Sequence, residues 1–302
     1  MNEGSAEPIR FFHRYNQREE VEAIYGEPFL RWAYGNPLGK LSVETVAKRG
    51  LFSHWYGWRM SRPSSRQRVE RFIDTFAIDR DEMIQAPHEF QSFNDFFSRR
   101  LKPEARPISP AAKDVVFPAD GRHLGFQDLS EVDGVFVKGQ TFHLSELFQS
   151  QSLADRYEKG SAVLSRLCPT DYHRFHFAAA GVPNTAKMIK GSLYSVSPIA
   201  LRNQLAYLWQ NKRMLTIMKT QHLGELAIIE FGATNVGSIT QVYDTDRKVE
   251  KGSEKGYFSF GGSATMVFFE PNRVQLSADL IENTTINREL YAHMGDCMGT
   301  VI

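Results

Sequence analysis

The sequence changes character near residue 103, and this change constrains the fold more than any other feature. Before it, apolar residues recur at helical spacing, and after it short β-type runs alternate with turn signals. Three prolines in KPEARPISP (102–110) end the helical pattern. We therefore predict an α+β protein with a basic helical region over 1–102. A mainly antiparallel β core with one or two inserted helices follows over 103–302.

Individual elements can be assigned within the two parts. In the N-terminal part we predict helices over 17–25, 41–60 with a break near Gly50, 64–78, and 92–101, where Ser92 and Asn94 are possible caps. In the C-terminal part we predict strands over 114–117, 134–139, 161–167, 215–218, 225–231 and 264–269. One helix is expected over 144–160.

Basic residues are concentrated in one region. The whole chain carries a formal charge of +1, yet residues 29–71 hold nine basic side chains and two acidic ones. Three of the four tryptophans lie in the same region. Bases interleaved with aromatic rings suit either nucleic acid or an anionic membrane interface, and the amphipathic spacing favours the membrane. A solvated helical hairpin packed on the core is the alternative, while no nucleic-acid-binding motif accompanies the bases.

The cellular location follows from what the sequence lacks. No apolar run reaches the length needed to span a bilayer, and the N-terminus has no apolar signal segment. These absences make the cytoplasm the default location. Together with the basic, tryptophan-rich residues, they lead us to expect a membrane-associating region over 1–102 and a peripheral protein on the cytoplasmic side of the cell membrane. With only two cysteines, Cys168 and Cys297, no zinc-ligand set can be assembled, and no metal is expected.

Three short segments carry reactive side chains. The first, FPADGR, holds Asp120 before a glycine, which taken alone is most simply a turn. The second, DYHRFHF, holds His173 and His176, which would point to opposite faces if the segment is a strand. Either histidine could act as an acid or base. The third segment is GYFSFGGSATMVFF, in which Gly261, Gly262 and Ser263 interrupt a strand-like run. The glycines are explained either by a bulge in the strand or by a backbone conformation that frees a reactive serine.

Taken together, these segments resemble the phosphatidylserine decarboxylase family. The resemblance extends from about residue 92 to residue 269 and includes FNDFFSRRLKPEARPI, LSRLCPTDYHRFHF, FGATNVGSI and VEKGSEKGYFSFGGS in the family's order. The Gly-Gly-Ser form of the last motif is similar to one branch of that family.

The resemblance implies a proenzyme that cleaves itself between Gly262 and Ser263 into a β chain (1–262) and an α chain (263–302). Ser263 would attack the preceding carbonyl, with His176 as base and Asp120 orienting that histidine. Ser263 would then become an N-terminal pyruvoyl group, the cofactor that forms a Schiff base with phosphatidylserine. Loss of CO2 would give phosphatidylethanolamine, and His173 is implied in that decarboxylation.

The resemblance also implies partners and leaves alternatives open. The partners are an anionic phospholipid membrane, the phosphatidylserine substrate, and the protein's own β and α chains as a heterodimer or a higher oligomer, without nucleic acid. One alternative is a pyruvoyl-dependent decarboxylase of a soluble, aromatic amino acid, and another is an unprocessed, non-enzymatic membrane-binding relative. Ala264 stands where the family usually has Thr or Ser, so we expect slower maturation than in an Ala264→Thr variant.

Overall fold

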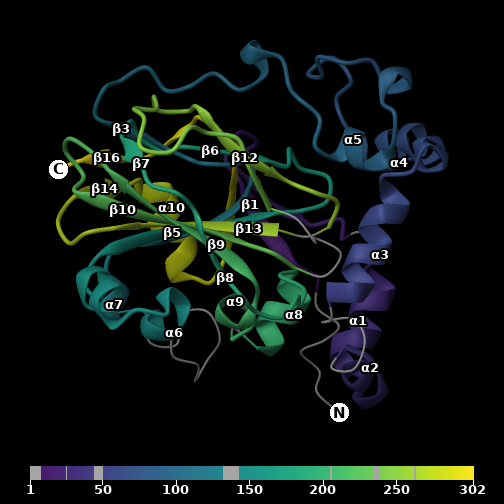
Figure 1. Ribbon diagram of the computed structural model, residues 1–302, viewed down its shortest axis with the longest axis horizontal. Helices are drawn as coiled ribbons and strands as arrows, with labels where there is room; N and C mark the ends of the chain where they lie inside the picture. Colours follow the sequence, from purple (N-terminus) through teal and green to yellow (C-terminus); the bar gives the residue numbers. More distant parts are fainter. Residues whose placement is uncertain are drawn as a thin grey trace.

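Most of the apolar runs in the second half of the chain lie in one large sheet, as the computed structural model shows (Figure 1). The structure describes residues 8–24, 26–43, 50–131, 143–204, 206–233, 239–261 and 263–302. The strand order is β2-β1-β15-β4-β5-β13-β10-β9-β7, and β8 also pairs with β9. The strands are β1 (Arg10–His13), β2 (Arg18–Val21), β4 (Gly121–Phe126), β5 (Ser161–Leu167), β7 (Val182–Pro183), β8 (Lys187–Ile189), β9 (Arg213–Lys219), β10 (Glu225–Phe231), β13 (Ser263–Phe269) and β15 (Glu289–Ala292).

The sheet is mainly antiparallel, as the sequence predicts. Strands β1 and β15 run parallel, and the other neighbours in this sheet are antiparallel. Two further three-stranded sheets do not share its strands, and their orders are β11-β12-β6 and β14-β16-β3. Their strands are β3 (Asp114–Val116), β6 (Arg174–His176), β11 (Ile239–Gln241), β12 (Glu254–Phe258), β14 (Val274–Leu276) and β16 (Cys297–Val301).

Strand β13 lies between two apolar cores and is buried along its whole length. Ala264, Met266 and Phe268 belong to a core that also contains side chains of the helices near residues 147–157 and 208–209. Val267 and Phe269 belong to the opposite core, together with residues of β3, β14 and β16. Because side chains alternate along a strand, the polar residues Ser263 and Thr265 share the face of Val267 and Phe269.

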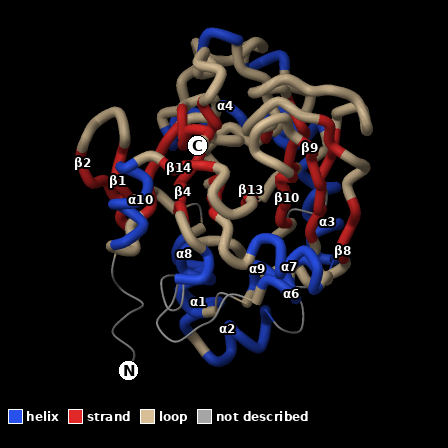
Figure 2. Tube along the Cα trace, turned by 90° about the vertical axis from the view of Figure 1, so that its left-hand side faces the viewer, coloured by secondary structure: helices blue, strands red, loops and turns tan. Residues whose placement is uncertain are grey.

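The helices form two groups. In Figure 1, α1–α3 follow one another along the right-hand side with α4 and α5 above them, and in Figure 2 the shorter helices α6–α9 lie below the strands. The N-terminal helices are α1 (Glu27–Gly35), α2 (Pro37–Ser42), α3 (Gly50–Met60), α4 (Arg68–Phe76) and α5 (Phe93–Phe97). The later helices are α6 (Leu144–Phe148), α7 (Gln151–Tyr157), α8 (Pro198–Asn203), α9 (Tyr207–Gln210) and α10 (Ala278–Thr285). Short 3-10 turns occur at Pro63–Gln67, Pro87–Glu89, Pro103–Ala105 and Leu129–Glu131.

Several predicted elements are confirmed. Helix α4 buries Val69, Phe72 and Ile73 on one side, and α5 begins at the predicted cap, where the Ser92 hydroxyl accepts a hydrogen bond from the Asp95 amide at 3.1 Å. The helix predicted over 144–160 is divided into α6 and α7, and helices α1 and α8–α10 were not predicted. The strand predicted over 134–139 lies outside the described residues.

The helix predicted over 17–25 is wrong. Residues 18–21 form β2, which pairs antiparallel with β1 and so joins the N-terminus to the edge of the large sheet. The next residue, Glu22, explains why this segment is a strand. Its side chain is buried and forms an ion pair with Arg166 of β5 at 2.6 Å. A short, charged segment has little stability as an isolated helix. The ion pair between Glu22 and Arg166 therefore determines its conformation. The N-terminal part is therefore helical over most of its length but also contributes to the β core.

Candidate active site

The hydroxyl group of Ser263 is buried at the first position of β13. The residue is 0% exposed, and its Oγ has no hydrogen-bond partner among the described residues. Its neighbour across the sheet is Leu167 of β5. A buried polar atom without a partner costs about 1–3 kcal/mol. Such a cost is typical of a group that is held for chemistry, so Ser263 fits the role of a reacting nucleophile.

The segment before Ser263 is held by the helical part of the chain. The Phe260 amide donates a hydrogen bond to Oδ1 of Asn94 at 2.8 Å, and the Phe260 ring packs edge-on against the ring of Phe97 at 4.9 Å. Gly261 is buried and has a φ of 142°, a backbone conformation that favours glycine. Gly262, the residue before the predicted cleavage point, lies outside the described residues.

His173 lies beside this segment, immediately before β6. It is 0% exposed, and its ring is 3.9 Å from the ring of Phe97. Its Nδ1 lies 3.0 Å from the carbonyl oxygen of Asp171, so Nδ1 carries the proton and Nε2 is the free acceptor. Burial lowers the pKa of His173 to about 3, although the hydrogen bond to the backbone of Asp171 opposes this shift. His173 is therefore neutral near pH 7.

His176 is the last residue of β6 and is also buried. Its backbone amide donates to the carbonyl oxygen of Pro118 at 2.7 Å, which places it next to the turn that carries Asp120. Burial lowers the pKa of His176 to about 4, and the negative charge of Asp120 is the main opposing influence. The Nδ1 atom of His176 is buried without a partner among the described residues. This histidine is also neutral near pH 7 and can accept a proton.

Asp120 is 1% exposed and is held by an ion pair. Its carboxylate pairs with the Arg106 guanidinium at 2.7 Å and accepts a hydrogen bond from the Met294 amide at 2.9 Å. In the part of the chain that the structure describes, no hydrogen bond joins Asp120 to His176, or either histidine to Ser263. The three predicted triad residues therefore lie in one buried region without forming a hydrogen-bonded chain.

One small apolar cluster joins the segments that carry these residues. It consists of Ala119, Leu167, Phe175 and Phe258, each at most 1% exposed, with Ile239 packed against it. Ala119 precedes Asp120, Leu167 is the cross-strand neighbour of Ser263, Phe175 lies between the two histidines, and Phe258 leads to the Gly261 segment. Segments far apart in the sequence thus meet around a single core.

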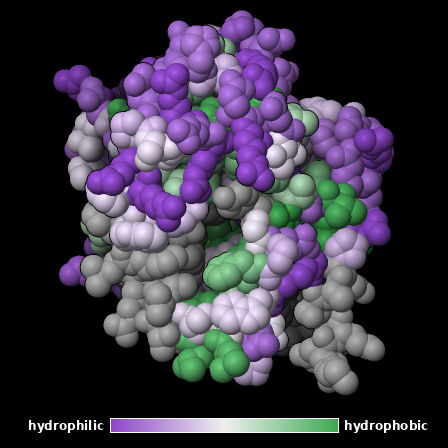
Figure 3. All heavy atoms as spheres, turned by 90° about the vertical axis from the view of Figure 1, so that its right-hand side faces the viewer, coloured by the Kyte–Doolittle hydropathy of each residue, from purple (hydrophilic) through white to green (hydrophobic). Residues whose placement is uncertain are grey.

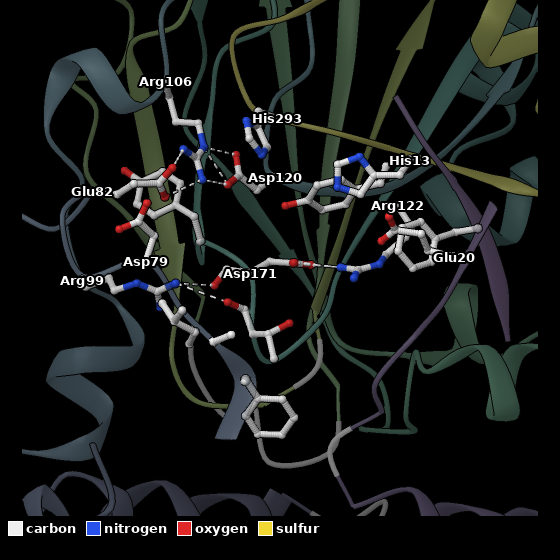
Figure 4. Close-up of a pocket in the computed structure, with 17 residues that line it drawn as sticks. His13, Glu20, Asp79, Glu82, Arg99, Arg106, Asp120, Arg122, Asp171 and His293 are labelled. Atoms are coloured by element: carbon white, nitrogen blue, oxygen red, sulfur yellow. Dashed lines mark hydrogen bonds and ion pairs between the residues drawn. The ribbon is translucent and has the colours of Figure 1, made fainter. Parts of the chain in front are cut away.

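A polar cavity of about 310 Å³ lies beside this region (Figure 4). Asp120 and the loop at 170–172, which leads directly to His173, form part of its wall, while Ser263, His173 and His176 do not line it. Further wall residues come from the N-terminal hairpin and from residues 76–82 and 99–106. In the close-up, the side chains of Arg99, Arg106 and Asp120 surround the same opening.

Comparison with known proteins identifies the family. The sequence pattern of the phosphatidylserine decarboxylase family matches residues 93–298. The chain belongs to this family. It is 41% identical over 291 residues to the phosphatidylserine decarboxylase proenzyme of Desulfitobacterium hafniense, covering 96% of this chain and 98% of that protein. The proenzyme of Fusobacterium nucleatum is 43% identical over 293 residues, covering 97% and 98%, and that of Clostridium perfringens is 40% identical over 291 residues, covering 96% and 99%.

Sequence analysis missed several residues that hold this candidate site together. Asn94 and Phe97 contact the segment before the predicted cleavage point, and Arg106 pairs with Asp120. Arg174 donates to the carbonyl oxygen of Ser98 at 2.9 Å and pairs with Glu254 of β12. The motif FNDFFSRRLKPEARPI could have pointed to Asn94, Phe97 and Arg106. It contributed to the family resemblance, but no role was assigned to its polar residues.

The surroundings of Ala264 differ from what the sequence suggested, namely a site where a hydroxyl group would assist cleavage. Ala264 is 0% exposed and belongs to the apolar core that contains Phe231 and Met266. It therefore lies on the face of β13 opposite to Ser263. A hydroxyl group at 264 would enter that apolar core instead of approaching Ser263. The geometry gives no support to slower maturation caused by the missing hydroxyl.

Proposed function

We propose that this chain is a precursor that cleaves itself between Gly262 and Ser263 and converts Ser263 into a pyruvoyl group. Membership of the phosphatidylserine decarboxylase family makes it a carboxy-lyase that forms phosphatidylethanolamine and CO2 from phosphatidylserine. The observation that carries the proposed maturation is the buried Ser263 hydroxyl, which has no partner among the described residues. Neutral histidines lie on an adjoining segment.

In the proposed cleavage, Oγ of Ser263 attacks the carbonyl carbon of Gly262. An ester bond forms, the peptide C–N bond breaks, and the proton leaves Oγ for the nitrogen of Ser263 by way of His176. Asp120 stabilises the protonated form of His176, consistent with its effect on the pKa of that histidine. Loss of the Cα proton of Ser263 then breaks the Oγ–Cβ bond, and Gly262 leaves as a carboxylate. The resulting enamine takes up a proton at Cβ and becomes an imine, and water then replaces ammonia at the α-carbon of residue 263, leaving a ketone.

The surroundings of Ser263 suit a reactive carbonyl at that position. A pyruvoyl group there supplies a ketone that condenses with the substrate amine and accepts the electrons released as CO2 leaves. His173 presents an unprotonated Nε2 on a ring that is fixed through Nδ1 and by contact with Phe97. We assign to His173 the positioning of the substrate carboxylate or the return of a proton to the α-carbon. The rings of Phe97 and Phe260 exclude water from this side of the site.

The two chains are expected to stay together after cleavage. Strand β13 would belong to the α chain (263–302), yet it pairs over seven residues with β5 and over five with β10, both in the β chain (1–262). Strands β15 and β16 of the α chain likewise pair with β4 and β3 of the β chain. The sheet ladders therefore predict a tight heterodimer of the two products.

The N-terminal helices provide a surface suited to a membrane. Several apolar side chains on α1–α3 are exposed, among them Phe29, Leu38 and Leu41 at 58%, 70% and 59%. Figure 3 shows apolar residues on the lower half of this face, with hydrophilic residues above them. On α3, Trp55 and Trp58 are each about half exposed, and the guanidinium of Arg62 lies 3.8 Å from the Trp58 ring centroid.

Among the described residues, no helix combines the length and the apolar character needed to span a bilayer. Exposed aromatic rings with adjacent arginines suit the headgroup region of an anionic membrane. We therefore propose peripheral binding to the cytoplasmic face of the cell membrane. This face also argues for a lipid substrate over a soluble amino acid, because a soluble substrate would not require exposed apolar side chains.

Intact mass spectrometry of the purified protein, beside a Ser263→Ala variant, tests the maturation. We expect chains of 262 and 40 residues, the shorter one lighter by one ammonia than its serine form, and a single 302-residue chain in the variant. A single uncleaved chain in the parent protein would refute the proposal. Assays with phosphatidylserine in anionic and neutral liposomes and with free aromatic amino acids then test the substrate. Turnover of the amino acids alone would support the alternative decarboxylase.

A further inference from the structure

Arg99 differs from the other two arginines that line the cavity of Figure 4. Each of the others is neutralised by buried or half-buried carboxylates. These ion pairs are Arg106–Asp120 at 2.7 Å, Arg106–Glu82 at 2.7 Å and Arg122–Asp171 at 2.6 Å. Arg99 has no carboxylate within ion-pair distance among the described residues. Its guanidinium lies 5.0 Å from the ring centroid of Phe96. The cavity therefore contains one arginine that contacts an aromatic ring but has no ion-pair partner among the described residues.

The guanidinium of Arg99 is also short of hydrogen bonds. The residue is 4% exposed, and its Nη2 makes two long hydrogen bonds, each 3.3 Å, to the carbonyl oxygens of Thr170 and Asp171. Its Nε and Nη1 are buried without a partner among the described residues. A guanidinium has five N–H donors and keeps its charge near neutral pH. Leaving the donors of Nε and Nη1 unpaired in a buried position is therefore unfavourable. An anionic ligand in the cavity would remove this cost.

Arg99 is close to the proposed reaction centre. The carbonyl oxygen of Asp171 accepts from Nη2 of Arg99 at 3.3 Å and lies 3.0 Å from Nδ1 of His173. A single oxygen atom therefore lies between the guanidinium and the histidine assigned to decarboxylation. The two residues are coupled electrostatically as well, because the charge of Arg99 contributes to the lowered pKa of His173.

We propose that Arg99 binds the phosphodiester of the phosphatidylserine headgroup, an inference that rests on the proposed function. In the headgroup, the phosphate is joined to the α-carbon by one methylene and one ester oxygen, so it lies close to the reacting atoms. The phosphodiester keeps its charge throughout the reaction. The carboxylate loses its charge as CO2 leaves, so a guanidinium bound to it would stabilise the ground state more than the transition state and slow the reaction.

The carboxylates that line the cavity affect which anions can bind there. Glu20 and Asp79 also line it, and Glu20 pairs with Arg18. Asp79 accepts a hydrogen bond from the Asp81 amide and has no cationic partner among the described residues. These carboxylates repel a dianion. A singly charged phosphodiester that carries an ammonium group nearby should therefore bind better than inorganic phosphate.

Binding to the uncleaved Ser263→Ala chain tests this site without catalysis. The probe is glycerophospho-L-serine, the soluble headgroup, measured by titration calorimetry. We expect Arg99→Gln to weaken binding by about 10- to 100-fold, which is typical of losing a charge-assisted pair of hydrogen bonds. Arg100→Gln removes the adjacent, exposed arginine and should leave binding unchanged. Equal affinity in the Arg99→Gln and parent chains would overturn the proposal.

Competition identifies the group that is recognised. Glycerophosphoethanolamine keeps the phosphodiester and lacks the carboxylate, so it should displace the probe, whereas L-serine should not. Inorganic phosphate should compete weakly. Displacement by L-serine without displacement by glycerophosphoethanolamine would assign Arg99 to the carboxylate and refute the phosphodiester site. If Arg99→Gln does not fold, Arg99→Lys keeps the charge without the planar fork and should weaken binding by about 3- to 10-fold.

Steady-state kinetics on the matured enzyme give an independent measurement. Intact mass first confirms that the Arg99→Gln chain is cleaved. KM for phosphatidylserine should then rise by about 10- to 100-fold while kcat changes little, because the interaction is the same in the ground and transition states. An unchanged KM would refute the role of Arg99 and leave the proposed function intact. Failure of the parent protein to mature would instead refute the proposed function, and the binding test would still apply.

Discussion

Lowering the pH from 7 to 5 is expected to destabilise the folded chain, because three histidines are buried in their neutral form. Burial lowers the pKa of His123 and His173 to about 3 and that of His176 to about 4. In the unfolded chain, each should titrate near its ordinary pKa of about 6.5. Below that pH the unfolded state binds more protons than the folded state, so the free energy of unfolding falls as the pH falls.

The size of the effect follows from these pKa values. Each histidine contributes about 1.4 kcal/mol per pH unit between its unfolded and folded pKa values. From pH 6.5 to pH 5 this amounts to about 2 kcal/mol for one histidine and about 6 kcal/mol for all three. The loss should continue until His176 begins to protonate in the folded chain near pH 4. A typical domain has only about 5–15 kcal/mol in total, so the chain should approach unfolding by pH 5.

Urea unfolding of the uncleaved Ser263→Ala chain at pH 7, 6 and 5 measures this effect. A His123→Gln variant is the matched control, because His123 is buried but has no proposed role in catalysis. Its Nδ1 lies 2.9 Å from the Ser165 hydroxyl oxygen, and its Nε2 lies 3.1 Å from the Ala292 carbonyl oxygen. The variant should lose about 4 kcal/mol over this range instead of about 6. A constant free energy of unfolding, or equal losses in the two chains, would refute the reasoning.

Three further substitutions test individual contacts. Lys255→Met should lower the free energy of unfolding by about 3–5 kcal/mol in urea, because it leaves Glu230 buried without its ion-pair partner at 2.9 Å, and adding Glu230→Leu should restore most of the loss. Ala264→Thr should cost about 1–3 kcal/mol by placing a hydroxyl in an apolar core, without shortening the maturation half-time seen by intact mass. Arg106→Gln removes the ion pair of Asp120, so it should slow cleavage in the same assay, and an unchanged rate would contradict that role of the pair.

Local sequence patterns were sufficient where an element depends on its own residues. The amphipathic spacing of 68–76 and the cap at Ser92 predicted α4 and α5, and the apolar runs predicted β5, β10 and β13. Local patterns gave the wrong prediction at 18–21. The conformation of this segment depends on the pairing of β2 with β1 and on the ion pair of Glu22 with Arg166. A contact between residues so far apart in the chain leaves no periodic signal near either one.

The candidate reactive residues were easier to find than the residues that support them. Asp120 and Ser263 stand beside glycines in unusual contexts, and the two histidines are close together in the sequence. In contrast, Arg99 and Arg106 lie in a segment rich in charged residues, where an arginine is ordinarily solvated. Their burial becomes evident only when this segment packs against the 170–174 loop and the turn at Asp120.

The structure also separates the two histidines, which the sequence could not do. His173 is fixed through Nδ1 and lies beside the Gly261 segment, whereas His176 follows the turn that carries Asp120 and is affected by its charge. Both remain neutral in the folded chain down to about pH 4, well below the pH at which their burial begins to destabilise the fold. A loss of self-cleavage near pH 5 would therefore report unfolding instead of protonation of the base. In chains that remain folded, the cleavage rate should be independent of pH between about 5 and 7.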